Sequence, residues 1–146
     1  MVKEIKSKSS FKTFEHITCR VMCESGAMIF VNVYRRHYSV IHRHTVTEFL
    51  AEFSCFLSEL NTLSTPITMV GDFNFHVEFV QRSDDFPSLT SNHEQRKNEA
   101  ISFLQLLTDF SYIQKINEPT HDASGTLDLL ILSQDNKTIE SIEVGY

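Results

Sequence analysis

The apolar residues of this chain follow two different periods, and the order in which these periods alternate restricts the possible folds. Residues 14–23 show the two-residue spacing of a β-strand, and residues 45–60 repeat apolar side chains at steps of three and four. The predicted elements are strands at 14–23, 28–34, 67–70 and 126–132 and helices at 45–60 and about 97–110. This order, β-β-α-β-α-β, predicts a single layered α/β domain.

The first strand and the region before the second helix allow finer predictions. Ile17, Cys19, Val21 and Cys23 fall on one face of strand 14–23, so we predict that this face belongs to the core. Residues 81–98 are polar and lack a hydrophobic period, so we predict a surface loop there.

Composition and charge exclude several classes of protein. The length of 146 residues suits one domain, and the net charge of −6 argues against an extended basic surface for nucleic acid. Three cysteines without a Cys-x-x-Cys pair indicate neither a disulfide framework nor a zinc site, which favours a reducing compartment. No apolar stretch approaches the length of a membrane span, and no signal peptide is apparent, so we predict no membrane partner.

The N-terminal residues 1–12 carry four lysines, at positions 3, 6, 8 and 12. A short basic arm that binds phosphate is one interpretation of this cluster. A solvated chain end is the simpler one, and we predict that 1–12 is a frayed basic N-terminus.

The stretch "MVGDFNFHVE" at 69–78 places polar groups directly after a buried strand. Gly71 permits a tight exit from the strand, and Asp72 and Asn74 offer the oxygen ligands that Mg²⁺ prefers. The same residues are also good turn formers, so spacing alone leaves both interpretations open. Asp128 is a second acidic group inside an apolar strand, and a charge in that position requires a partner.

Three motifs in order, Val-Tyr-Arg within "FEHITCRVMCESGAMIFVNVYRR", Gly-Asp-Phe-Asn within "PITMVGDFNFHVE" and Thr-Leu-Asp within "INEPTHDASGTLDLLILS", carry a resemblance over nearly the whole chain. Together they resemble the endonuclease domain of LINE-type (non-LTR) retrotransposons, a branch of the endonuclease/exonuclease/phosphatase superfamily. The resemblance implies a four-layer α/β sandwich that uses Mg²⁺ to nick target DNA. It also implies a longer parent protein with a reverse transcriptase domain, acting inside the cell at the nucleus.

The resemblance also implies roles for individual residues. Asp72 would activate or orient the attacking water and is the one candidate Mg²⁺ ligand, and Asn74 would bind the scissile phosphate and align Asp72. Tyr34 would contact phosphate through its hydroxyl, and Asp128 would orient a histidine that stabilises developing charge.

The sequence departs from the family pattern at both ends. The family has an Asn and a metal-binding Glu upstream of the part matched here, and a Ser-Asp-His element downstream, and none of these occurs in the 146 residues. We therefore predict a single partial domain over 1–146, truncated at both ends, with exposed sheet edges and an open sandwich face. Little or no hydrolysis is expected from this chain alone.

Histidines and arginines near the motifs are further candidates. His76 and His121 are candidate substrate-binding residues, although packing at the site edge is the simpler role for His76 and a surface loop is the simpler place for His121. A small basic loop, consisting of Arg35, Arg36, His42, Arg43 and His44, either contacts phosphate or is simply solvated.

Two other functions stay open at this point. One is a phosphatase of the same superfamily, acting on phosphoinositides or other small phosphoesters. The other is a degenerate remnant without catalysis that persists as a binding or interaction module. A nicking assay and a panel of phosphoester substrates would separate these functions from DNA cleavage.

Overall fold

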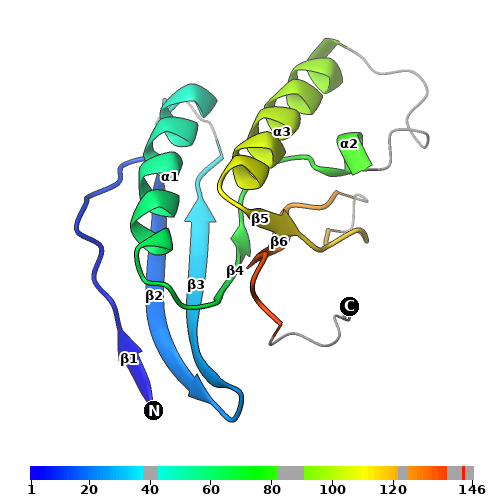
Figure 1. Cartoon of the computed structure of the whole chain (residues 1–146). Coiled ribbons are helices and arrows are strands. Elements are labelled where there is room, and N and C mark those ends of the chain that lie inside the picture. The colour runs from blue at the N-terminus through cyan, green and yellow to red at the C-terminus, as the bar shows by residue number, and fades with distance from the viewer. Residues whose placement is uncertain (38–42, 82–90, 122–124, 138–142, 144–146) are drawn as a thin grey trace.

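The computed structural model describes residues 1–37, 43–81, 91–121, 125–137 and 143. In this part of the chain, strands form one mixed sheet in the order β1-β2-β3-β4-β6-β5 (Figure 1). The strands are β1 (Val2–Glu4), β2 (Phe14–Cys23), β3 (Gly26–Arg35), β4 (Ile67–Asp72), β5 (Tyr112–Gln114) and β6 (Asp128–Ser133). The helices are α1 (Val46–Asn61), α2 (Glu78–Gln81) and α3 (Ser91–Asp109).

The centre of the sheet is a parallel pair flanked by antiparallel strands. β3 and β4 run parallel, as a crossover through α1 requires, while β2 and β6 pair antiparallel with β3 and β4. α1 begins with a capping box in which the Thr45 side chain accepts from the N–H of Glu48 and the Glu48 side chain accepts from the N–H of Thr45. Because β3 and β4 run parallel, their carboxyl ends lie at the same edge of the sheet.

The core lies between the sheet and the two long helices, α1 and α3, which cover the same face (Figure 1). Phenylalanines fill much of this space: Phe49 and Phe53 of α1 contact Phe103 of α3 at ring-centroid distances of 6.1 and 5.9 Å. Phe103 also stacks on Phe75 at 4.5 Å. Aromatic pairs at these distances add to the stabilisation from burial alone.

The prediction that Ile17, Cys19, Val21 and Cys23 face the core is wrong. The alternate residues of β2 contribute Phe14 and Thr18 to the core, whereas Ile17 is 62% exposed and both cysteines are partly exposed. Both faces of the strand carry apolar side chains, so the two-residue spacing could not decide between them. The large aromatic ring of Phe14, packed among Phe49, Phe53 and Phe56, lies on the helix side.

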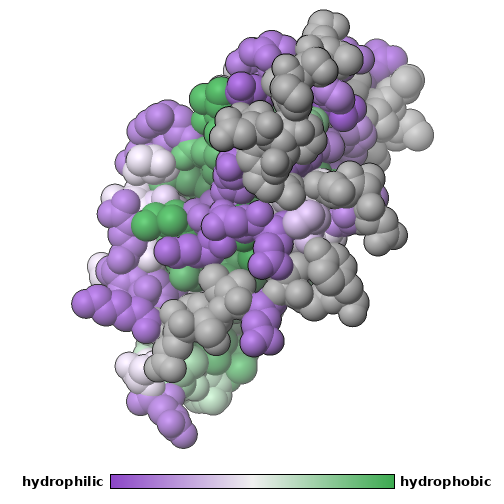
Figure 2. All heavy atoms as spheres, turned by 90° about the vertical axis from the view of Figure 1, so that its right-hand side faces the viewer, coloured by the Kyte–Doolittle hydropathy of each residue, from purple (hydrophilic) through white to green (hydrophobic). Residues whose placement is uncertain are grey.

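The face of the sheet opposite the helices is open in the described part of the chain. Tyr34 and Ile113 lie on it and are 47% and 42% exposed. Figure 2, which views the molecule from the β5 side, shows separate hydrophobic patches among hydrophilic side chains. The expectation of an uncovered sandwich layer stays a prediction.

Two further predictions need correction. Residues 1–12 are not frayed: β1 pairs with β2, and Ser7 and the N–H of Lys8 donate to the carboxylate of Glu59. The predicted loop at 81–98 contains the first part of α3, which begins at Ser91. Those first turns are polar because they lie at the surface, so they show no apolar stripe, and residues 82–90 lie outside the described residues.

The mixed α/β class is confirmed, with the predicted strands and helices in the predicted order. The four-layer sandwich stays a prediction, because the described residues form one sheet covered on one face. Among the helices described, none has the length and apolar character needed to cross a bilayer.

Candidate functional site

Three of the predicted site residues form a row across neighbouring strands. Tyr34 at the end of β3 is the register partner of Asp72 in β4, and Asp72 is the partner of Asp128 in β6. Residues directly opposite in an antiparallel pair have Cα atoms roughly 4.5–5.5 Å apart and side chains on the same face. The sheet thus brings the two aspartates and the tyrosine together at one edge, on the open face.

Gly71 makes the close approach of β3 and β4 possible at this edge. Its φ is +149°, and a Cβ added there would lie 1.8 Å from the carbonyl oxygen of Val33. Only glycine avoids this overlap with the neighbouring backbone. The close packing of β3 against β4 therefore requires a glycine before Asp72, a reason that is independent of any turn.

Asn74 leaves the strand direction, and its side chain does not follow that of Asp72. It adopts φ +52°, and its N–H donates to Oδ1 of Asp72 at 3.0 Å. Its side-chain Nδ2 donates to the backbone oxygen of Arg35 at 2.5 Å. Asn74 thus aligns Asp72 through its main chain, while its amide nitrogen is engaged with β3.

The Asp72 carboxylate lies in a partly buried and electrically unfavourable place. Burial is the largest cause that raises the pKa of Asp72, and the nearby charge of Asp128 raises it further. The N–H of Asn74 and the positive charges of Arg35 and His121 act in the opposite direction. A carboxylate whose pKa is raised accepts protons more readily than an ordinary surface aspartate.

Asp128 is less enclosed than its sequence context indicates. It is the first residue of β6 and is exposed, so it does not require the partner that a buried charge would. The hydroxyl of Thr120 accepts from the N–H groups of Leu127 and Asp128 at 3.1 and 3.2 Å, which ties the preceding loop to the start of the strand. His121 follows Thr120 directly and is close enough to influence the pKa of Asp72.

His76 contacts two residues that follow it closely in the chain, Glu78 and Phe79. Its Nδ1 lies 2.8 Å from Oε1 of Glu78, and its ring stacks on Phe79. Glu78 is only 3% exposed, and its Oε2 accepts from the N–H of Thr126 at 3.0 Å. The glutamate fixes the imidazole, and substrate binding by His76 stays a prediction.

Among the described residues, the charged side chains that are buried are Arg35 and Glu78, and the sequence predictions placed neither of them in the interior. Ile29, Val31 and Val33 occupy the core face of β3, and the same two-residue spacing puts Arg35 on that face. This spacing is the signal in the sequence that places Arg35 in the interior, and the prediction of a basic surface loop that includes Arg35 is wrong for this residue. His42 of that predicted loop lies outside the described residues.

Asp72 and Asp128 are the carboxylates of this row that are available to a divalent cation. Mg²⁺ commonly binds through one or two carboxylates and takes its other ligands from water and substrate phosphate. Asp72 and Asp128 supply two carboxylates whose mutual repulsion a cation would relieve. Among the described residues, no group of three or more His, Cys, Asp or Glu side chains is placed to hold a metal ion.

The fold and the site together define a mixed α/β protein with an acidic row at the carboxyl edge of its central strands. No family model matches the sequence, and no curated protein matches it. Among solved structures, the chain is similar to the cytolethal distending toxin of Haemophilus ducreyi, at 17% identity and a TM-score of 0.39. The match covers 90% of this chain and 43% of the toxin chain, so this chain spans less than half of that length.

Proposed function

We propose that this chain carries part of the phosphodiester-cutting centre of a LINE-type endonuclease, with DNA as its substrate. The observation that supports this most is the row of Tyr34, Asp72 and Asp128 across three adjacent strands. The three residues come from separate motifs of the sequence, and the family resemblance assigns all of them to one site. A reverse transcriptase domain in a longer parent protein is the proposed partner.

Each residue of the row has a chemical role that its surroundings permit. Asp72, with a raised pKa, would accept a hydrogen bond from the attacking water and orient it toward phosphorus. Tyr34 is 47% exposed on the same face, so its hydroxyl can donate to a phosphate oxygen. Asn74 would keep the Asp72 carboxylate in place through its N–H.

Asp72 would hold Mg²⁺, with Asp128 beside it, and the cation would neutralise charge that develops on the phosphate oxygens. Asp128 would orient a histidine, and His121 is the candidate for that histidine. His121, in the loop before β6, lies close enough to Asp72 to lower its pKa. With two carboxylates in the described site, we propose slow cleavage at best.

A plasmid-nicking assay in Mg²⁺ tests this function with a matched pair of variants. Asp72→Asn removes the charge but keeps an oxygen that can accept from the N–H of Asn74. Asp109→Asn makes the same change at an exposed position at the end of α3. We expect Asp72→Asn to lower the nicking rate by about 100-fold or more, whereas Asp109→Asn leaves it unchanged.

Two outcomes would contradict the proposed function. Equal nicking by the unchanged protein and Asp72→Asn would mean that Asp72 does not take part in the reaction. No nicking by any of the proteins, at any Mg²⁺ concentration, would favour the alternative of a module without catalysis.

A further inference from the structure

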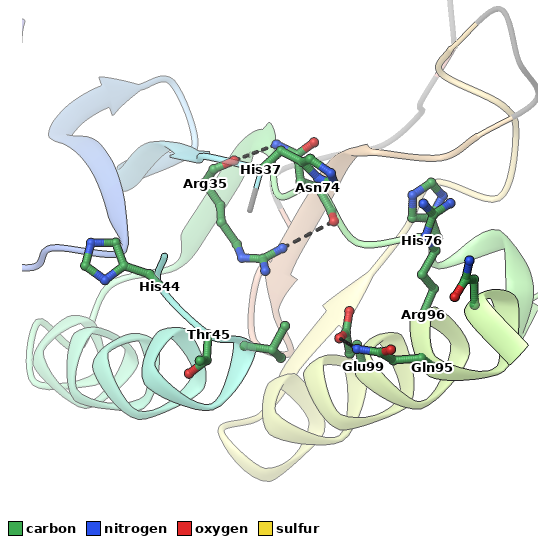
Figure 3. Close-up of a pocket in the computed structure, with 11 residues that line it drawn as sticks. Arg35, His37, His44, Thr45, Asn74, His76, Gln95, Arg96 and Glu99 are labelled. Carbon is green, nitrogen blue, oxygen red and sulfur yellow. Dashed lines mark hydrogen bonds between the residues drawn. The ribbon is translucent and has the colours of Figure 1, made fainter. Parts of the chain in front are cut away.

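A recess opens on the helix side of the sheet, opposite the face that carries Tyr34, Asp72 and Asp128. It is a pocket of about 410 Å³ between the ends of β3 and β4 and the N-terminal parts of α1 and α3 (Figure 3). Polar side chains dominate its lining, among them Arg35, Asn74, Arg96 and Glu99. The aspartates at 72 and 128 are not among the lining residues.

Arg35 is the most enclosed charge of this pocket, being 7% exposed. Its Nη1 donates to the backbone oxygens of Phe73 and Asn74 at 3.0 and 3.2 Å. Its guanidinium carbon lies 4.2 Å from the centroid of the Phe75 ring, which holds the group flat. Figure 3 shows the guanidinium pointing into the space between the two helices.

Part of the Arg35 guanidinium is left for a ligand. In the described part of the structure, Nε and Nη2 make no hydrogen bond, yet no fully buried side-chain nitrogen or oxygen there lacks a partner. Nε and Nη2 are therefore not fully enclosed, and the pocket that Arg35 lines is the open space beside the guanidinium (Figure 3). A guanidinium has five N–H donors in a rigid fork, so a nearly buried one with free donors is a preformed anion contact.

The other walls of the pocket add donors and positive charge. Asn92, Gln95, Arg96 and Glu99 follow one another at helical spacing on the same side of α3. Two guanidinium groups thus face one carboxylate, and Gln95 donates to that carboxylate at 3.1 Å. The N-termini of α1 and α3 both border the pocket and contribute positive partial charge.

We propose that this pocket binds a phosphate group. A tetrahedral anion with several acceptor oxygens matches a fork of unused N–H donors from Arg35 and a second guanidinium from Arg96. The pocket has a volume of about 410 Å³, which is much larger than a sulfate or phosphate ion. The bound phosphate can therefore carry a further group. Its source is either a free phosphate compound or the backbone of a nucleic acid, and the two share this chemistry.

The pocket connects to the acidic row through Asn74. The backbone oxygen of Asn74 accepts from Arg35, and its N–H donates to Asp72. The phosphate would therefore sit on the opposite side of this residue from the aspartates. Its binding needs neither a metal ion nor cleavage, so it does not rest on the proposed function.

Titration of the whole chain with inorganic phosphate, followed by calorimetry at constant ionic strength and without Mg²⁺, tests the proposal. Arg96→Gln removes a charge from the pocket. Arg36→Gln removes a charge at the surface, where Arg36 forms an ion pair with Glu15. We expect Arg96→Gln to raise the dissociation constant about tenfold and Arg36→Gln to change it less than about twofold. Neither position is buried, so both variants should fold.

A change of opposite sign gives a second test. Among the described lining residues, Glu99 is the acidic one, so Glu99→Gln should lower the dissociation constant several-fold, while Glu94→Gln on the same helix should not. Equal effects of Arg96→Gln and Arg36→Gln, or no phosphate binding at about 10 mM, would overturn the proposal. The dissociation constants of a duplex oligonucleotide for the same variants would identify the source. If they rank as those of inorganic phosphate do, the source is nucleic acid; if only inorganic phosphate shows the ranking, the source is a small phosphate compound.

Discussion

Arg35 and Asn74 hold each other through two hydrogen bonds of opposite direction. Nη1 of Arg35 donates to the backbone oxygen of Asn74 at 3.2 Å, and Nδ2 of Asn74 donates to the backbone oxygen of Arg35 at 2.5 Å. The pair joins the end of β3 to the segment that leaves β4. Because the N–H of Asn74 also donates to Asp72, the orientation of that carboxylate depends on the pair.

Substitution of Asn74 tests this dependence. Asn74→Ala would lose the bond to Arg35 and place an alanine at φ +52°, and we expect it to lower the free energy of unfolding by about 2 kcal/mol. Asn74→Gly loses the same bond without the backbone strain, so its cost should be about 1 kcal/mol. Urea unfolding measures both values. Equal losses for the two variants would show that the left-handed backbone is not a source of strain.

Gly71 should be among the least replaceable residues of the sheet. In Gly71→Ala the new Cβ overlaps the carbonyl oxygen of Val33, and relief requires β3 and β4 to separate. We expect a loss of about 3 kcal/mol or more, against about 1 kcal/mol for Gly26→Ala, where φ is +120° but no atom lies within 4 Å. Thermal unfolding followed by circular dichroism would compare them. A similar loss at both positions would contradict the close approach of the strands.

The strands β2, β3, β4 and β6 and the helices α1 and α3 were predictable from the sequence because their apolar residues follow a local period, whereas the short elements β1, α2 and β5 were not predicted. The family resemblance added Tyr34 to the site. Apolar spacing identified β3 and β4, and the polar residues that follow them had to meet at the same edge. That Asp128 lies beside Asp72 was a hypothesis from the sequence, and the pairing of β4 with β6 bears it out. These features need no knowledge of what packs on either face.

The features that could not be predicted depend on tertiary packing. The choice of Phe14 rather than Ile17 for the core of β2 follows from the phenylalanines of α1, which lie far along the chain. The side chain of Asn74 turns toward Arg35 because its backbone enters the left-handed region, and residue types alone allowed either direction. The first turns of α3 are helical without an apolar stripe, so periodicity could not reveal them.

Glu78 should make stability depend on pH in the acid range. Burial alone would raise the pKa of Glu78, but hydrogen bonds from His76 and from the N–H of Thr126 together hold the pKa below its ordinary value of 4.5. A lowered pKa means that the contribution is present above pH 4.5 and is lost as the pH falls through the folded pKa. We expect Glu78→Gln to cost about 1–3 kcal/mol at pH 7 and much less near pH 3.

Urea unfolding at a series of pH values measures the effect of Glu78→Gln. Glu94→Gln, at an exposed position in the first turn of α3, is the control and should cost little at any pH. A loss for Glu78→Gln that stays constant down to pH 3 would show that packing, not the ionised carboxylate, is responsible.

Asp72 should have the opposite effect on stability, because the fold disfavours its charge. Burial, followed by the charge of Asp128, raises the pKa of Asp72 above 3.8, so above this value the native state retains a proton that the unfolded chain releases. Stability then falls as the pH rises from 3.8 through the folded pKa, and the cost persists at neutral pH. Asp72→Asn removes the charge and keeps an acceptor for Asn74, so it should be more stable than the unchanged protein at pH 7.

The difference in unfolding free energy between Asp72→Asn and the unchanged protein should therefore grow from pH 3 to pH 7. For Asp109→Asn the same difference should stay flat, because that aspartate lies at the surface. Millimolar Mg²⁺ at pH 7 should reduce the advantage of Asp72→Asn, since a bound cation stabilises only the protein that keeps the carboxylate. If Asp72→Asn is less stable than the unchanged protein at pH 7, the ionised carboxylate of Asp72 is favourable in the fold. Repulsion between Asp72 and Asp128 would then give no reason for a cation to bind there.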